Sequence, residues 1–252
     1  MSAAYKIPQL AVVLLAMVLA GCASRPSRTS SAPPAPVSAP PAQAAPAPVE
    51  GRDFRVDSGD SLLTIQVYKG GPLSRAGHNH VIASHSMKGF VSVPEDLMRT
   101  SFEIHIPVDE LVVDEEDLRV EAGPDFPPKV PEEARVGTKR NMLGAALLDS
   151  DRYREIVLHS EAIQRGAQGL EVQVRVIVRD RATSVVVPVQ YEIRGDFLRV
   201  LGETSLKQSD LGLTPYSLFG GALRVEDEMK VKFRIVARAV AAPAPAEPNT
   251  RP

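Results

Sequence analysis

The feature that most constrains this chain is an alternation of apolar and polar residues with a period of two. It is clearest over residues 170–178, where Leu and Val alternate with Glu171, Gln173 and Arg175. The same period recurs over residues 63–67, 101–108, 185–193 and 229–237. Successive side chains of a strand point to opposite faces, so each segment predicts a strand with one buried face. One-sided strands of this kind are typical of antiparallel sheet and not of parallel sheet.

Such strands must hide both an apolar face and their edges, and closure into a barrel does both. We therefore predict an all-β protein, a closed antiparallel barrel of about eight strands. Turns are predicted at residues 179–182 and 195–196, between alternating segments. Residues 113–131 interrupt the pattern, and their acidic run is interpreted as a solvated loop and not as a calcium site. One or two short helices are expected after Pro131, limited by Gly137 and Gly144.

Composition divides the chain into segments. Residues 22–50 and 241–252 are rich in Pro and Ala, with few large apolar groups, and are predicted to be a disordered linker and a disordered tail. The folded domain is then residues 51–240. Its formal charge balance is close to neutral (−2 for the whole chain), which gives no basic face for nucleic acid. Cys22 is the only cysteine, so no disulfide within the chain stabilises the fold.

The amino terminus has the features of a secretory signal over residues 1–21: a short basic start, an apolar run and small residues at the end. Residues 19–22, Leu-Ala-Gly-Cys, resemble the lipobox of bacterial lipoproteins, in which the cysteine is acylated after cleavage. This resemblance implies lipidation of Cys22 and stable membrane anchoring, since two or more acyl chains suffice for it. An ordinary signal with a chance cysteine is the alternative. The expected location is the cell envelope, periplasm-facing, at the outer membrane.

The order of elements resembles the YceI-like family over about residues 54–239. The resemblance is carried by short segments in a shared order: FRVDSGDS at 54–61, MKGF at 87–90, LDSDRYREI at 148–156, SDLGL at 209–213 and VEDEMKV at 225–231. The chain departs from the family pattern at Asp60, where His is usual, at Arg154, where Pro is common, and at Leu211, where Phe is usual. The resemblance implies a lipocalin-like barrel that holds a polyisoprenoid or another long-chain lipid.

If the barrel is hollow, its inward-facing apolar residues are the ligand-binding residues. The strand pattern and the resemblance together predict these as Leu63, Ile65, Val67, Phe90, Phe102, Ile104, Val172, Val174, Val176, Val187, Val189, Tyr191, Val231 and Phe233. Periodicity does not distinguish a hollow barrel from one filled by side chains. A filled barrel would instead indicate a structural or partner-binding envelope lipoprotein with an exposed apolar patch.

The sequence contains one cluster of side chains that could bind a metal ion or take part in catalysis, the histidines His78, His80 and His85. We place His78 and His80, with Tyr216 and Phe219 of an apolar loop, at the mouth of the barrel. As an alternative, the three histidines would bind zinc or copper in a metal-binding protein or a metal-dependent enzyme. Only two of them are well placed for one ion, and no metalloprotease or nucleophile motif accompanies them. We therefore predict no cofactor and no enzymatic activity, and leave the oligomeric state open, a dimer included.

Overall fold

The computed structural model describes residues 51–167 and 169–240. The predicted signal peptide, Cys22, the linker and the tail at 241–252 lie outside the described residues, and their predictions stay predictions. Within the described part, no helix has the length and apolar character needed to span a membrane.

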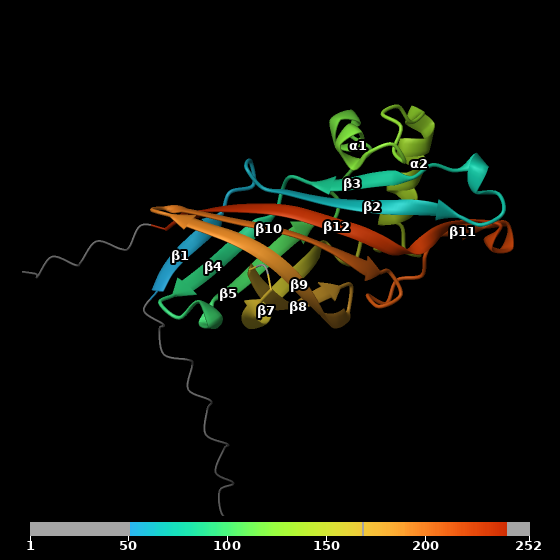
Figure 1. Cartoon of the computed structure of the whole chain (residues 1–252). Helices are drawn as coiled ribbons and strands as arrows, with labels where there is room; N and C mark the ends of the chain where they lie inside the picture. Colours follow the sequence, from blue (N-terminus) through green and yellow to red (C-terminus); the bar gives the residue numbers. More distant parts are fainter. Residues whose placement is uncertain (1–50, 168, 241–252) are drawn as a thin grey trace, which may run out of the picture. The chain divides into compact units, whose positions relative to one another are not determined.

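Eight antiparallel strands form a closed barrel, which confirms the predicted fold (Figure 1). Around the ring the hydrogen-bonded order is β1–β4–β5–β7–β8–β9–β10–β12, and β12 pairs with β1 to close it. The strands are β1 (Gly51–Val56), β4 (Lys88–Pro94), β5 (Ser101–Pro107), β7 (Glu155–Gly166), β8 (Gly169–Val178), β9 (Arg181–Arg194), β10 (Phe197–Lys207) and β12 (Leu223–Ala239). Each strand of the ring therefore pairs with a neighbour on both sides, although β9 pairs with β10 only through residues 189–194.

The period-two pattern sets which side chains enter the barrel. In β8, residues Val172, Val174, Val176 and Val178 are buried, while the residues between them are more exposed. The turns predicted at residues 179–182 and 195–196 join β8 to β9 and β9 to β10, but the first is shorter than predicted, because β9 already begins at Arg181. Phe54 and Ala237, both fully buried, pack with Val91 and Leu198 in a small cluster at the β1 end. The alternation read from the sequence is therefore the alternation between interior and surface.

One edge of β12 changes partner along its length. Residues 224–234 pair with β2 (Leu62–Gly70), whereas residues 237–239 pair with β1. Ser61 lies at this change and is buried; its hydroxyl accepts from Val236 N–H at 3.0 Å and donates to the Val236 carbonyl at 3.2 Å. Beyond β2 the sheet continues through β3 (His80–Ser84) to β6 (Val112–Val113), outside the ring. These strands extend one wall past the barrel proper.

Two helices, α1 (Glu116–Ala122) and α2 (Glu132–Leu143), lie beside β3 and β6 (Figure 1). Helix α2 follows Pro131 as predicted, but it runs through Gly137 without interruption and ends at Gly144. The interpretation of the acidic run as a solvated loop is wrong, since Asp114 is buried and Glu116 and Asp117 begin α1, in which Arg119 is also buried. The remaining short elements are η1 (Ser74–Ala76), η2 (Leu97–Arg99), β11 (Ser217–Leu218) and η3 (Phe219–Gly221).

Candidate ligand-binding cavity

The barrel encloses a cavity of about 210 Å³, here called the inner cavity. Its wall is almost entirely apolar: among the described residues that line it, only Thr100, Tyr191 and Thr204 carry a side-chain oxygen or nitrogen. The wall includes most residues predicted to face the interior, namely Leu63, Ile65, Phe102, Ile104, Val172, Val174, Val176, Val187, Val189, Tyr191, Val231 and Phe233. A space with this lining offers an apolar chain dispersion contacts and few hydrogen-bonding groups.

The prediction that Phe90 faces the interior is wrong. Its side chain is 51% exposed on the outer face, where the guanidinium of Arg55 lies 5.1 Å from the ring centroid. Its neighbours Val91 and Val93 line the inner cavity instead. Because adjacent residues of a strand face opposite sides, Phe90 must point outward once Val91 is inside.

A second cavity of about 250 Å³, the mouth cavity, adjoins the first. Both cavities are lined by Ile65, Ile156, Val178, Leu211 and Met229. Taken together, the two fall within the roughly 300–1,000 Å³ usual for ligand pockets. The two cavities thus form adjoining parts of one binding region.

The mouth cavity is lined by three of the four residues predicted at the mouth: His78, His80 and Tyr216. Val67, predicted inside the barrel, also lines this cavity. Phe219 does not line it; its side chain is 76% exposed at the start of η3, so its placement at the cavity wall is wrong. Phe219 also has a positive φ of 52° and begins the short turn that it forms with Gly220 and Gly221.

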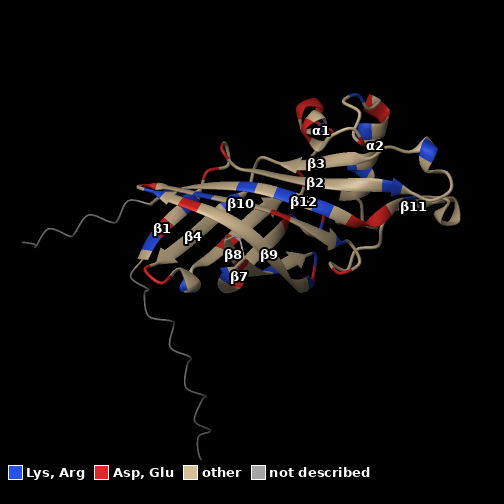
Figure 2. Cartoon of the chain, in the orientation of Figure 1, with Lys and Arg blue, Asp and Glu red and all other residues tan. Residues whose placement is uncertain are grey.

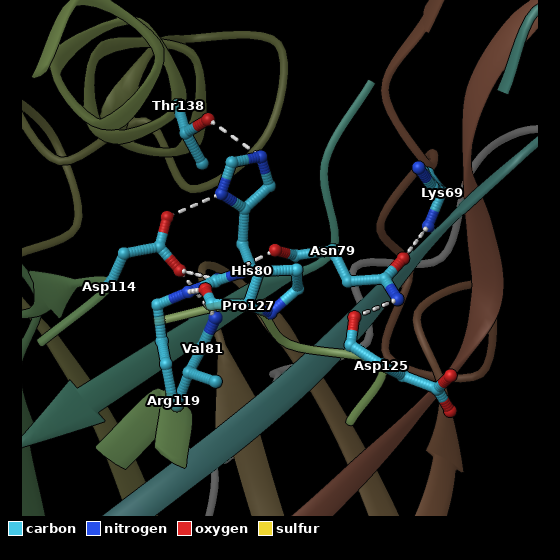
Figure 3. A network of polar contacts seen from close by, with 9 residues as sticks. All are labelled: Lys69, Asn79, His80, Val81, Asp114, Arg119, Asp125, Pro127 and Thr138. Atoms are coloured by element: carbon cyan, nitrogen blue, oxygen red, sulfur yellow. Dashed lines mark hydrogen bonds and ion pairs between the residues drawn. The ribbon is translucent and has the colours of Figure 1, made fainter. Parts of the chain in front are cut away.

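A buried polar network supports one wall of the mouth cavity (Figure 3). The carboxylate of Asp114 accepts hydrogen bonds from the backbone N–H of Val81 at 2.9 Å and from Arg119, and its other oxygen lies 2.6 Å from Nδ1 of His80. Arg119 also donates to the carbonyls of Asn79 and Pro127, each at 2.7 Å. The network joins β3, α1 and the loop after α1 through fully paired buried charges.

The electrostatics of Asp114 follow from these contacts. Burial by itself raises the pKa of this carboxyl, but the hydrogen bonds from His80 and Val81 and the nearby charges of His80 and Arg119 outweigh it. The pKa of Asp114 therefore lies below its ordinary value. Because the carboxylate is favoured, Asp114 acts as a fixed negative anchor for His80 and Arg119.

The three predicted metal ligands do not converge. His80 has Nδ1 at Asp114 and Nε2 at 3.2 Å from the hydroxyl of Thr138 on α2. His85 instead pairs with Glu115, its Nε2 lying 2.7 Å from the carboxylate. The rings of His78 and His80 have centroids 6.2 Å apart. Within residues 51–167 and 169–240, no group of three or more His, Cys, Asp or Glu side chains is placed to hold a metal ion.

Asp114, His80 and Thr138 stand in the order carboxylate, imidazole and hydroxyl, the arrangement of groups in a catalytic triad. Two features oppose a nucleophilic role. Thr138 lies in the middle of α2, where backbone N–H groups are engaged in the helix and do not form an oxyanion hole. The Asp114 carboxylate is also shared with Arg119. The chain of contacts instead fixes the position of the His80 ring between β3 and α2.

Asp114 and Arg119 are the site residues that sequence reasoning missed. They sit within a run of acidic residues, which suggested solvation, and only the apolar residues at 111–113 before Asp114 signal a buried strand there. Arg119 is the single basic residue among the acidic positions from 114 to 121. A lone arginine within an acidic helix is a signal for an internal ion pair.

Comparison with known proteins identifies the family. Residues 55–237 match the family model of the YceI-like domain. The chain belongs to the YceI-like family. The sequence has no significant match among curated proteins.

Solved structures with a similar fold include BcnA of Burkholderia cenocepacia, at 17% identity and a TM-score of 0.53 over 72% of this chain and 98% of that one. At this identity the likeness shows a shared fold. A polyisoprenoid-binding domain from Saccharophagus degradans gives 10% identity and a TM-score of 0.47, covering 74% of this chain and 98% of that one. The YceI protein of Campylobacter jejuni gives 5% identity and a TM-score of 0.44, covering 62% and 82%.

Proposed function

We propose that this protein binds a long-chain lipid, a polyisoprenoid or a similar apolar chain, within its barrel, and that it acts as a binding protein and not as an enzyme. The observation that carries the proposal is the nearly unbroken apolar wall of the inner cavity. Membership of the YceI-like family supports the same class of ligand. Transfer of apolar surface from water into this wall is favourable by about 25 cal/mol per Å².

The alternatives are less well supported. The filled-barrel hypothesis required an interior without space, whereas the barrel has two adjoining cavities. The metal hypothesis required converging histidines, whereas His80 and His85 are held by different carboxylates.

Native mass spectrometry of the full-length protein, released from mild detergent, tests lipid binding. We expect an added mass that matches a long-chain lipid, and uptake of the same class of lipid when it is supplied to the delipidated protein. A Val187→Trp variant should lose this uptake because Val187 is buried and lines the inner cavity. The matched control is Val186→Trp, which places the same side chain on the outer face of β9, where Val186 is 57% exposed.

Equal uptake by these two variants, or a bare mass with no uptake, would count against the proposal. Circular dichroism shows whether Val187→Trp still folds. If it does not, Val187→Phe, a smaller intrusion into the same space, replaces it.

We further propose that the protein works in the periplasm, anchored to the outer membrane through acylated Cys22. The lipobox-like residues 19–22 support this proposal. Metabolic labelling with a palmitate analogue should mark the full-length protein and leave a Cys22→Ala variant unmarked, and separation of the two membranes should recover the label with outer-membrane markers. Equal labelling of both forms would contradict the anchor.

A further inference from the structure

The mouth cavity differs from the inner cavity in its polar lining. Among the described residues that line it, Lys69, His78, His80, Thr138, Asn141, Gln208 and Arg224 have polar or basic side chains, and none is Asp or Glu. These residues come from elements far apart in sequence, including the end of β2, helix α2 and the start of β12. The folded chain thus places a mainly apolar cavity that carries several basic and polar side chains directly against an almost wholly apolar one.

The basic groups at the mouth are only partly neutralised. Lys69 donates from Nζ to the carbonyl of Gly77 at 2.9 Å and has no carboxylate partner among the described residues. Arg224 contacts Glu226 at 3.2 Å on the exposed side. The buried carboxylate nearby, Asp114, is already paired with Arg119. Figure 2 shows basic positions near the end of β2 and in the turn after it, whereas much of α1 is acidic.

Two polar side chains in this lining are available for a ligand. His78 is exposed and Asn141 is only partly buried, so the polar atoms of both lining residues can be reached by a ligand. The pKa of His78 is lowered, first by burial and then by the neighbouring charges of His80, Lys69 and Arg119. Lys69 and Arg119 are the permanent positive charges near His78; Asp114 partly offsets them, and together the two cations favour an anion there over a further cation.

We propose that the mouth cavity binds the acidic head group, a phosphate or a carboxylate, of the lipid whose chain occupies the inner cavity. The inference rests on the proposed function and specifies the class of its ligand. Lys69 and His78 flank the head group, and Asn141 donates to it from α2. The residues shared by the two cavities form the passage through which the chain continues from the head group into the barrel.

The test compares geranylgeranyl phosphate with geranylgeraniol, which share one chain and differ only in the head group. Their affinities for the full-length, delipidated protein are measured by calorimetric titration at neutral pH and low salt. We expect the phosphate to bind about tenfold more tightly, the effect of one good charge-assisted hydrogen bond. Added salt should reduce this preference, because the basic residues lie near the solvent.

Three variants locate the effect. Lys69→Met and His78→Gln should each reduce the preference for the phosphate, and leave the affinity for the alcohol unchanged. The matched control, Lys88→Met, removes an exposed lysine of β4 that lines neither cavity, and should leave the preference intact. Lys69→Arg keeps the charge and should restore the preference, which also answers the objection that Lys69→Met disturbs the fold.

Each other outcome overturns the inference. If both lipids bind with equal affinity, or if Lys69→Met keeps the full preference, the head-group site is wrong while lipid binding stands. If neither lipid binds, the proposed function fails together with it. If inorganic phosphate alone displaces geranylgeranyl phosphate at comparable concentration, the site binds free phosphate and not a lipid head group.

Discussion

The inner cavity and the mouth cavity adjoin each other but are built in different ways. The inner cavity is enclosed by neighbouring strands whose apolar residues alternate with polar ones. The mouth cavity is supported by one buried ion-pair network in which Asp114, Arg119 and His80 come from separate elements. The wall of the inner cavity has many similar apolar contacts, so the loss of one side chain should cost comparatively little stability. A buried charge network loses more stability when one partner is removed, because the other charge is left unpaired. The two regions should therefore respond differently to single substitutions.

The largest effect is expected at the network. Asp114→Asn removes the charge that pairs with Arg119 and leaves that guanidinium buried without a carboxylate. We expect a loss of about 3–5 kcal/mol in the free energy of unfolding, measured by urea denaturation. Glu110→Gln, an exposed change four residues earlier, is the control and should have almost no effect. A loss below about 1 kcal/mol for Asp114→Asn would show that the network does not support the mouth.

A second prediction compares the same substitution, Phe to Ala, in the interior and on the outer face of the barrel. Phe233 lines the inner cavity, and its ring covers Gly202 on the neighbouring strand. Phe233→Ala should cost about 3 kcal/mol of unfolding free energy. Phe90→Ala removes the same ring from the surface and should cost less than about 1 kcal/mol, mainly its contact with Arg55. Equal costs would contradict the assignment of the two faces.

Acid should weaken the network through Asp114. Its pKa is lowered in the folded protein, so the unfolded chain binds more protons as the pH falls below the ordinary carboxyl range. The stability contributed by this group is present above the unfolded pKa and is lost as the pH falls through the folded pKa. Unfolding curves recorded from neutral to acidic pH should fall less steeply for Asp114→Asn than for the unchanged protein. Parallel curves would exclude this linkage.

The smallest effect is expected on the outer face at His105. Hydrogen bonds to Glu103 and then to Glu155 raise the pKa of this partly exposed imidazole. Its contribution is present below the unfolded pKa and is lost as the pH rises through the folded pKa. A slight decline in stability above neutral pH should therefore be absent in His105→Gln. The opposite change, a gain in stability with rising pH that depends on His105, would show that the pKa is not raised.

Much of the barrel could be predicted because its signal is local. The segment 170–178 predicted β8 and its inward-facing valines, and the turns on either side of β9 followed from short polar sequences. The errors also have local causes. Phe90 was predicted to face the interior, although the parity of Val91 and Val93 points it outward. Gly137 was taken to break a helix, yet a single glycine costs only about 1 kcal/mol, and the helix continues.

The network at the mouth could not be predicted in the same way. Asp114 is 34 residues from His80 and 33 from Val81, and an acidic run gives no sign of which carboxylate is buried. Thr138 lies 58 residues from His80, on another element. Contacts of this kind depend on how β3, β6 and the two helices pack, and no periodicity within one segment encodes that packing.

By itself, the sequence determined the class of fold and the apolar character of the barrel wall, because alternation along a strand is a property of neighbouring residues. Tertiary structure decided that the interior is hollow, that a second cavity with basic side chains on its wall adjoins the first, and that Asp114 is buried with Arg119. A cavity and a buried ion pair form only where segments distant in sequence pack together. Both depend on distances between those segments, which the order of residues along the chain does not give.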